Sequence, residues 1–193
     1  GDGPGDTIVH TTDPQETTVF AENLSGFEMQ ALRITGSKSC GVTMENVELT
    51  MTDCTVTGNT NSDIGPAGIS VMGGTLTLKN CTISDNRVDS ESGGVSGGGI
   101  GIDAANVTLT NCLVADNEAV STNTAETFGG GIFVEAGGTL TLKNTQVTRN
   151  FTNGLGGGIY VDDASTATLE NGSTVTLNDP TNCAGRAIAG CVG

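Results

Sequence analysis

Three carboxylates recur at one position of a repeated phrase. Asp103, Glu135 and Asp162 each stand three residues after the isoleucine of a Gly-Gly-Gly-Ile phrase, and Asp163 follows the last of them. Carboxylate oxygens suit Ca²⁺, which takes roughly six to eight oxygen ligands in flexible geometry. If the repeats stack, these side chains form one row. We therefore expect either a calcium site on this row or a set of carboxylates that splay into water.

The same row could serve an enzyme that degrades polysaccharides. Stacked repeats would place the carboxylates roughly 5 Å or roughly 10 Å apart, which brackets the distances in retaining and inverting glycosidases. However, a lyase acting on anionic sugars also needs a basic partner, and no Lys or Arg shares this repeat position. His10 is the single histidine and lies outside the repeats, so no Ser-His or Cys-His pair is expected. We expect no catalytic residue, and no cofactor other than Ca²⁺.

Two further sets of side chains could bind a ligand. Phe133 and Tyr160 each precede a carboxylate of the row by two residues, in a chain with only 3% aromatic residues. Outward aromatic rings beside carboxylates predict a contact face for carbohydrate or protein. A threonine recurs in the following phrase, at Thr50, Thr77, Thr108, Thr141 and Thr168. This ladder resembles the hydroxyl grid of β-helical ice-binding proteins, although Thr also simply favours strands.

The six cysteines indicate an oxidising compartment, because they include no CxxC pair and no Cys/His set. Three of them share one repeat position: Cys54, Cys81 and Cys112. We favour buried thiols that behave as small apolar groups, while a disulfide between stacked neighbours stays open. Cys183 and Cys191 stand outside the repeats and are expected to close a C-terminal loop. Cys40 has no obvious partner.

The spacing of the repeats predicts the fold. The isoleucines of the first phrase fall at Ile69, Ile100, Ile132 and Ile159, at intervals of 31, 32 and 27 residues. Each repeat contains three short segments of alternating apolar and polar residues and no helical period. The prediction is an all-β, right-handed parallel β-helix of about six coils, each with three short strands. In this register Ile132 and Leu142 are buried, whereas Phe133 and Thr141 point outward.

An asparagine or aspartate ends the second strand of each repeat. These residues are Asp53, Asn80, Asn111, Asn144 and Asn171. Asn tolerates a left-handed backbone and can hydrogen-bond to stacked copies of itself. We therefore expect a ladder of these side chains along one corner of the coil.

The charge of the chain excludes one class of partner. It has 22 acidic and 7 basic residues, a formal net charge of −15, and the bases are scattered. Nucleic acid binding requires clustered Lys and Arg, so nucleic acid is not an expected partner. No run of about 18 apolar residues occurs, so no membrane span is expected.

The repeat phrases also carry a family resemblance. The Gly-Gly-Gly-Ile phrases alternate with phrases that end in Asn, at Val56–Asn59, Ile83–Asn86, Val114–Asn117 and Val147–Asn150. This pattern resembles the polymorphic outer-membrane-protein repeat of secreted bacterial surface proteins. The resemblance implies display on an extracellular surface, adhesion or coat formation, and it implies no catalytic residue.

Three regions are expected: an N-terminal arm or cap (1–39), the β-helix (40–178) and a disulfide-closed cap (179–193). The main functional expectation is a secreted, non-catalytic structural protein that polymerises with itself into a surface filament, coat or matrix layer. Strand edges, the arm or the aromatic face would make the contacts. The alternatives are a monomeric adhesin that binds carbohydrate, a polysaccharide-degrading enzyme and an ice-binding protein.

Overall fold

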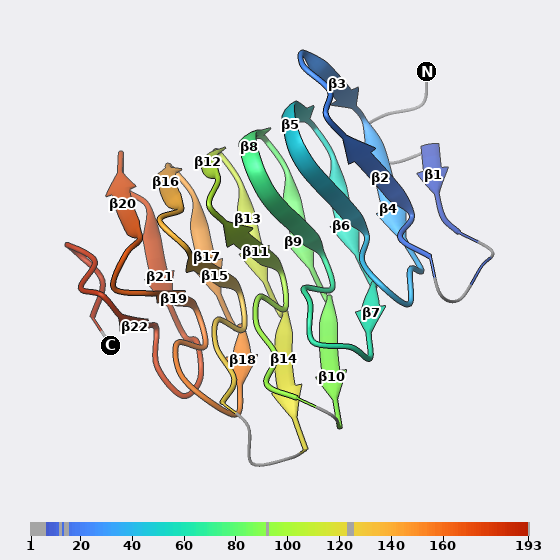
Figure 1. The fold of residues 1–193 in the computed structure, drawn as a ribbon. Helices are drawn as coiled ribbons and strands as arrows, with labels where there is room; N and C mark the ends of the chain where they lie inside the picture. Colours follow the sequence, from blue (N-terminus) through green and yellow to red (C-terminus); the bar gives the residue numbers. More distant parts are fainter. Residues whose placement is uncertain (1–6, 12, 14–15, 92, 123–125, 193) are drawn as a thin grey trace.

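The computed structural model describes residues 7–11, 13, 16–91, 93–122 and 126–192. In this part of the chain the regular secondary structure consists of parallel strands, which wind into six coils stacked along one axis. Figure 1 shows the stack, with the chain running from the N-terminal coil to the C-terminal coil without crossing back. The predicted all-β parallel β-helix is confirmed.

Three sheets run along the stack. The long, eleven-stranded sheet holds β2 (Val19–Glu22), β3 (Phe27–Gln30), β5 (Val42–Thr52), β8 (Ile69–Lys79), β11 (Ile100–Asp103), β12 (Asn106–Thr110), β15 (Ile132–Glu135), β16 (Thr139–Lys143), β19 (Ile159–Val161), β20 (Thr166–Glu170) and β22 (Cys183–Gly185). The seven-stranded sheet holds β1 (Thr7–Val9), β4 (Leu32–Thr35), β6 (Thr55–Thr57), β9 (Thr82–Ser84), β13 (Leu113–Ala115), β17 (Gln146–Thr148) and β21 (Thr174–Thr176). The four-stranded sheet holds β7 (Thr60–Asn61), β10 (Arg87–Ser90), β14 (Glu118–Ser121) and β18 (Phe151–Thr152).

The four-stranded sheet corrects the expected three strands per coil, since four successive coils contain a fourth strand. Its strands follow a buried asparagine of each coil, and they pair with one another in register, as Arg87 does with Glu118. They share little sequence from coil to coil, so alternation alone could not identify them. Backbone pairing holds these strands together, and the ion pair from Arg87 to Glu118 also joins β10 to β14.

The core register agrees with the sequence prediction. Ile132 and Leu142 are fully buried, and Ile132 pairs with Ile100 on one side and Ile159 on the other. β-Branched side chains at such positions stack about 4.8 Å apart on the pleated surface. The interior is therefore a set of columns of like residues. This packing fixes which side chains of β11, β15 and β19 point outward.

The predicted corner ladder is present on the surface from Asp53 to Asn144. Asn80, Asn111 and Asn144 have positive φ values of 54°, 55° and 47°. Asn111 donates from Nδ2 to Oδ1 of Asn80 over 3.2 Å, and Asn144 donates in the same way to Asn111 over 2.9 Å. Asn80 donates to Asp53 over 3.1 Å. The left-handed backbone turns the chain, and the amides tie neighbouring turns together.

A second asparagine ladder lies inside the coil and was not predicted as such. It runs through Asn59, Asn86, Asn117, Asn150 and Asn178. Each of the first four donates from Nδ2 to Oδ1 of the next over 2.9 Å, and that same Oδ1 also accepts the backbone N–H of the donor residue. Each ladder amide also donates to a backbone carbonyl, which satisfies these buried polar groups.

The first 39 residues carry strands of the same solenoid. β2 and β3 pair in register with β5, and β4 pairs with β6. Ala21, Met29 and Ile34 from these strands are buried in the core. Residues 19–35 thus form a coil, not a free arm. At the other end the expected disulfide joins Cys183 and Cys191, and the loop that it closes buries Ile188 against the core.

Candidate functional site

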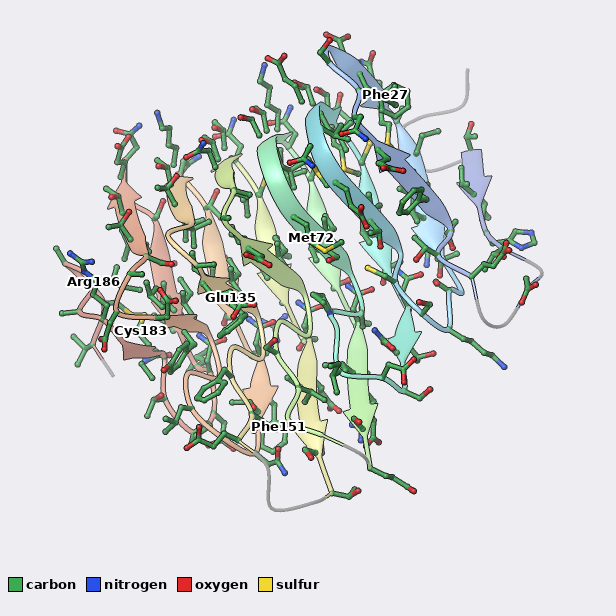
Figure 2. All side chains as sticks on the ribbon, in the orientation of Figure 1. Phe27, Met72, Glu135, Phe151, Cys183 and Arg186 are labelled. Carbon is green, nitrogen blue, oxygen red and sulfur yellow. A yellow bond between two sulfur atoms is a disulfide. The ribbon has the colours of Figure 1, made fainter. Side chains whose placement is uncertain are left out.

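A groove of about 440 Å³ lies on the outward face of the long sheet. Its floor is one outward column of residues, in which Thr43 pairs with Ser70, Ser70 with Gly101, and Gly101 with Phe133. Met72 also lines it, and Figure 2 shows Met72 and Glu135 on this face of the long sheet. The volume lies in the usual range of ligand sites, roughly 300–1,000 Å³.

One wall of the groove is the segment 61–66, which begins at the last residue of β7. Asn61 holds this segment in place, because its Nδ2 donates to the carbonyls of Gly65 and Pro66 over 2.9 and 3.1 Å. Its Oδ1 accepts the N–H of Asp63 over 2.9 Å. Pro66 lies directly over Gly101, where an added Cβ would approach the Pro66 Cγ to 2.3 Å. The missing side chain at Gly101 therefore lets the wall close over the sheet.

The opposite edge of the groove is acidic. Asp103 and Glu135 are paired in register on β11 and β15, and both line the groove. Burial raises the pKa of Glu135 above its usual range, and the negative charges of Asp103 and Asp162 raise it further. Asp63 contributes a third carboxylate from the wall. The residues that line the groove include no Lys, Arg or His.

Asp162 and Asp163, which complete the predicted calcium row, do not line the groove. The Asp162 carboxylate accepts the backbone N–H of Ala136 over 2.9 Å and of Ala164 over 3.1 Å. Burial acts to raise its pKa, but hydrogen bonds from Ser165 and these backbone groups outweigh burial and lower it. Within the described ranges, no three His, Cys, Asp or Glu side chains gather closely enough to hold a metal ion. The geometry gives the calcium prediction no support.

The aromatic face differs from the expected one in exposure. Phe133 points away from the core as predicted and pairs with Tyr160, but only 8% of it is exposed. The ring of Phe128 covers both, with ring centroids 6.0 Å from Phe133 and 4.4 Å from Tyr160. Sequence reasoning missed Phe128 because it lies in a connecting loop outside the alternating strands. Of the three rings, Phe133 lines the end of the groove, and Phe128 and Tyr160 pack behind it, with Tyr160 partly exposed.

The threonine ladder is in register on the other half of the long sheet. Thr77 pairs with Thr50 and Thr108, and Thr141 continues the row to Thr168. The neighbouring outward column is charged: it includes Lys79, Lys143 and Glu170, and the Lys143 ammonium lies 3.5 Å from the Glu170 carboxylate. These long charged side chains interrupt the flat hydroxyl surface that ice binding would need.

Comparison with known proteins identifies the fold class. A sequence model of the right-handed β-helix region matches residues 9–189. No curated protein and no solved structure matches the chain. The described residues form no helix that is long and apolar enough to cross a membrane.

Proposed function

We propose that this chain, which belongs to the family of right-handed β-helix proteins, is a secreted, non-catalytic protein that binds a neutral or amino-sugar glycan in its groove. The observation that carries the proposal is the composition of the groove. It combines one aromatic ring, Phe133, at one end, carboxylates along one edge and hydroxyls on its floor, without a basic side chain among its lining residues.

Each of these groups suits a sugar. Carboxylate oxygens accept hydrogen bonds from hydroxyl or ammonium groups, and bonds to a charged acceptor are the stronger ones. Apolar rings cover the carbon-bound hydrogens of a pyranose, as they cover other apolar surface. An anionic sugar would meet Asp103 and Glu135 without a compensating cation. The groove therefore favours a neutral or cationic glycan over an acidic one.

The floor column also suits an extended ligand. It continues beyond Thr43 to Phe20, which is 56% exposed. Four strand steps separate Phe20 from Phe133, or about 19 Å at the usual strand spacing. Because Pro66 covers Gly101, an oligosaccharide would lie over Phe20, Thr43 and Ser70, where it would contact an exposed ring and two hydroxyls.

The test is a calorimetric titration of the 193-residue chain with each of three soluble probes. The probes are a neutral gluco-oligosaccharide, a glucosamine oligomer and an oligogalacturonate of equal length. We expect binding of at least one of the first two and none of the anionic probe. Ser70→Phe fills the floor of the groove and should weaken binding at least tenfold. Thr77→Phe is the matched control, because it also points outward from β8 but stands outside the groove.

Three results would contradict the proposal. The first is that neither the neutral gluco-oligosaccharide nor the glucosamine oligomer binds at millimolar concentration. The second is an equal loss of affinity in Ser70→Phe and Thr77→Phe, which would place the ligand elsewhere. The third is cleavage of a bound probe, detected by chromatography of the reaction mixture, which would favour the enzyme alternative.

A second candidate function is a subunit of an extracellular filament or coat, and the first coil favours it. Phe20, Leu24 and Phe27 are exposed there, although they are large and apolar. Strand addition between copies would also satisfy main-chain groups at the edges of β2 and β22. If β2 of one copy continued the sheet beyond β22 of another, the register would place Glu22 beside Arg186. The resemblance to the polymorphic outer-membrane-protein repeat also points to surface display.

Sedimentation of the purified chain over a range of concentrations tests this candidate. We expect polymers that grow with added salt, because screening reduces the repulsion between chains of net charge −15. Phe20→Ser with Phe27→Ser should abolish them, and Arg186→Glu should weaken them. A chain that stays monomeric at high concentration and high salt would leave glycan binding as the remaining function.

A further inference from the structure

Three thiols form a continuous column at one corner of the coil. Cys54, Cys81 and Cys112 come directly before β6, β9 and β13, whose first residues pair in register. The backbone N–H of Cys81 donates to the Cys112 sulfur over 3.4 Å. In the next coil the same position holds Thr145, whose hydroxyl accepts the N–H of Cys112 over 3.2 Å. The thiols therefore contact their neighbours along the column.

Two of the three buried thiols reach the wall of a surface cavity. A surface cavity of about 400 Å³ is lined by Cys81 and Cys112, together with Asn80, Asn111 and Asn144 of the corner ladder. Cys112 is 5% exposed and Cys81 is 2% exposed, whereas Cys54 is 1% exposed and does not line the cavity. Access thus decreases from Cys112 to Cys54.

The pKa of the thiol also differs along the column. The hydrogen bond with Cys81 lowers the pKa of the Cys112 thiol, and the same bond raises the pKa of Cys81 to about 11. The hydrogen bond with Cys81 and burial raise the pKa of Cys54 further. Since the thiolate is the nucleophile in disulfide exchange, Cys112 is the thiol that reacts first.

We propose that Cys81 and Cys112 form a disulfide between neighbouring coils when the chain meets a disulfide oxidant such as oxidised glutathione, and that Cys54 stays reduced. In-register positions on parallel strands lie about 4.8 Å apart, within the Cα range of roughly 4.4–6.8 Å that disulfides span. Both residues stand at a corner, and the carbonyl of Cys81 accepts the backbone N–H of Leu113 over 3.0 Å, which holds the two coils in register at the thiols.

The exchange needs no group other than the oxidant. The Cys112 thiolate attacks one sulfur of oxidised glutathione, and one glutathione thiolate leaves. Cys81 then gives its proton to water and attacks the Cys112 sulfur of the mixed disulfide, which releases the second glutathione. In total, two protein thiols are oxidised and one molecule of oxidised glutathione is reduced to two thiols.

The experiment counts thiols in the folded chain before and after incubation with oxidised glutathione. The starting count is four, since Cys40, Cys54, Cys81 and Cys112 are free and Cys183 is paired with Cys191. After alkylation, denaturation and mass spectrometry we expect two thiols and a mapped peptide that links Cys81 to Cys112. The proposal is overturned if all four thiols persist, or if the link joins Cys54 to Cys81.

Threonine variants provide matched controls, because Thr145 already occupies the equivalent place in the column. Cys54→Thr should still lose two thiols and form the same link. Cys112→Thr should lose thiols at least tenfold more slowly than the unmodified chain. An unchanged rate in Cys112→Thr would show that Cys112 is not the thiol that reacts first. Circular dichroism of each variant checks that the coil is retained.

Discussion

Replacement of Glu135 by glutamine should make the protein more stable at neutral pH. Glu135 is partly buried and lies one strand step from Asp103, so its ionised form is opposed by desolvation and by a like charge. Glutamine keeps the shape of the side chain and removes the charge. Most substitutions at a packed position destabilise a protein, so a gain in stability would be specific to this electrostatic argument.

The magnitude follows from the strand spacing. Two unit charges about 4.8 Å apart repel by about 3.5 kcal/mol at an effective dielectric constant of 20 and by about 0.9 kcal/mol at 80. Both side chains are partly open to water, so solvent screening places the value near the lower figure. We expect Glu135→Gln to stabilise the fold by roughly 1 kcal/mol, or about 2–4 °C in melting temperature for a chain of this size.

The gain depends on pH with a definite sign. Because the pKa of Glu135 is raised in the folded state, the folded chain binds its proton more tightly than the unfolded chain does. The stability contributed by that proton is present below the unfolded pKa, about 4.3, and is lost as the pH rises through the folded pKa. The advantage of Glu135→Gln should therefore appear at pH 7 and vanish near pH 3.5.

Urea unfolding of both proteins at the two pH values measures this difference. Glu48→Gln is the control, since Glu48 is exposed and its register partner is the uncharged Thr75. Asp103→Asn removes the same repulsion, so the double variant should gain less than the sum of the single ones. A stability of Glu135→Gln equal to or below that of the unmodified chain at pH 7 would refute the reasoning.

Four further outcomes are expected. Asn117→Ala should cost about 2–4 kcal/mol in urea unfolding, because it leaves buried donors such as the Asn86 amide unpaired. Asn111→Gly, on the exposed ladder with a φ of 55°, should lower the free energy of unfolding by less than about 1 kcal/mol. A loss as large as that of Asn117→Ala would contradict the argument that the buried ladder contributes more stability than the exposed one. Gly101→Ala should destabilise by about 1–3 kcal/mol because its Cβ meets Pro66, and no loss would mean that the wall moves freely. The calcium prediction is tested by the melting temperature: the same value in calcium and in chelator would count against a site on the carboxylate row, and a rise with calcium would support it.

The sequence predicts well what repeats and poorly what does not. Ile132 and Ile159 follow the same phrase at a fixed position, so alternation identifies their side of the strand and their stacking. The corner position of Asn80 is equally regular. The buried position of Asn86 is regular too, but a polar residue at the end of a strand gives no sign in sequence that it points inward.

The groove shows the limit of this reasoning. Its wall, segment 61–66, and the ring of Phe128, which packs against Phe133, come from connections whose lengths and sequences differ between coils. Alternation cannot place such segments over a particular face. Residues 19–35 lack the Gly-Gly-Gly-Ile phrase, so the sequence predicts that they belong to an N-terminal arm or cap. Their pairing with β5 depends on Val19, Ala21 and Met29, whose alternation is too short to recognise without the coil beside it.

The buried asparagine ladder constrains how the length of this protein can change. Successive ladder residues are 27, 31, 33 and 28 positions apart, yet each pair makes the same amide contact. The differences are therefore absorbed in the connections, while the hydrogen-bonded part of every coil keeps its size. Such a chain can gain or lose a whole coil and remain continuous, and it can lengthen a connection without disturbing its neighbours. Binding surfaces built from connections, such as the 61–66 wall, can accordingly vary while the support beneath them stays the same.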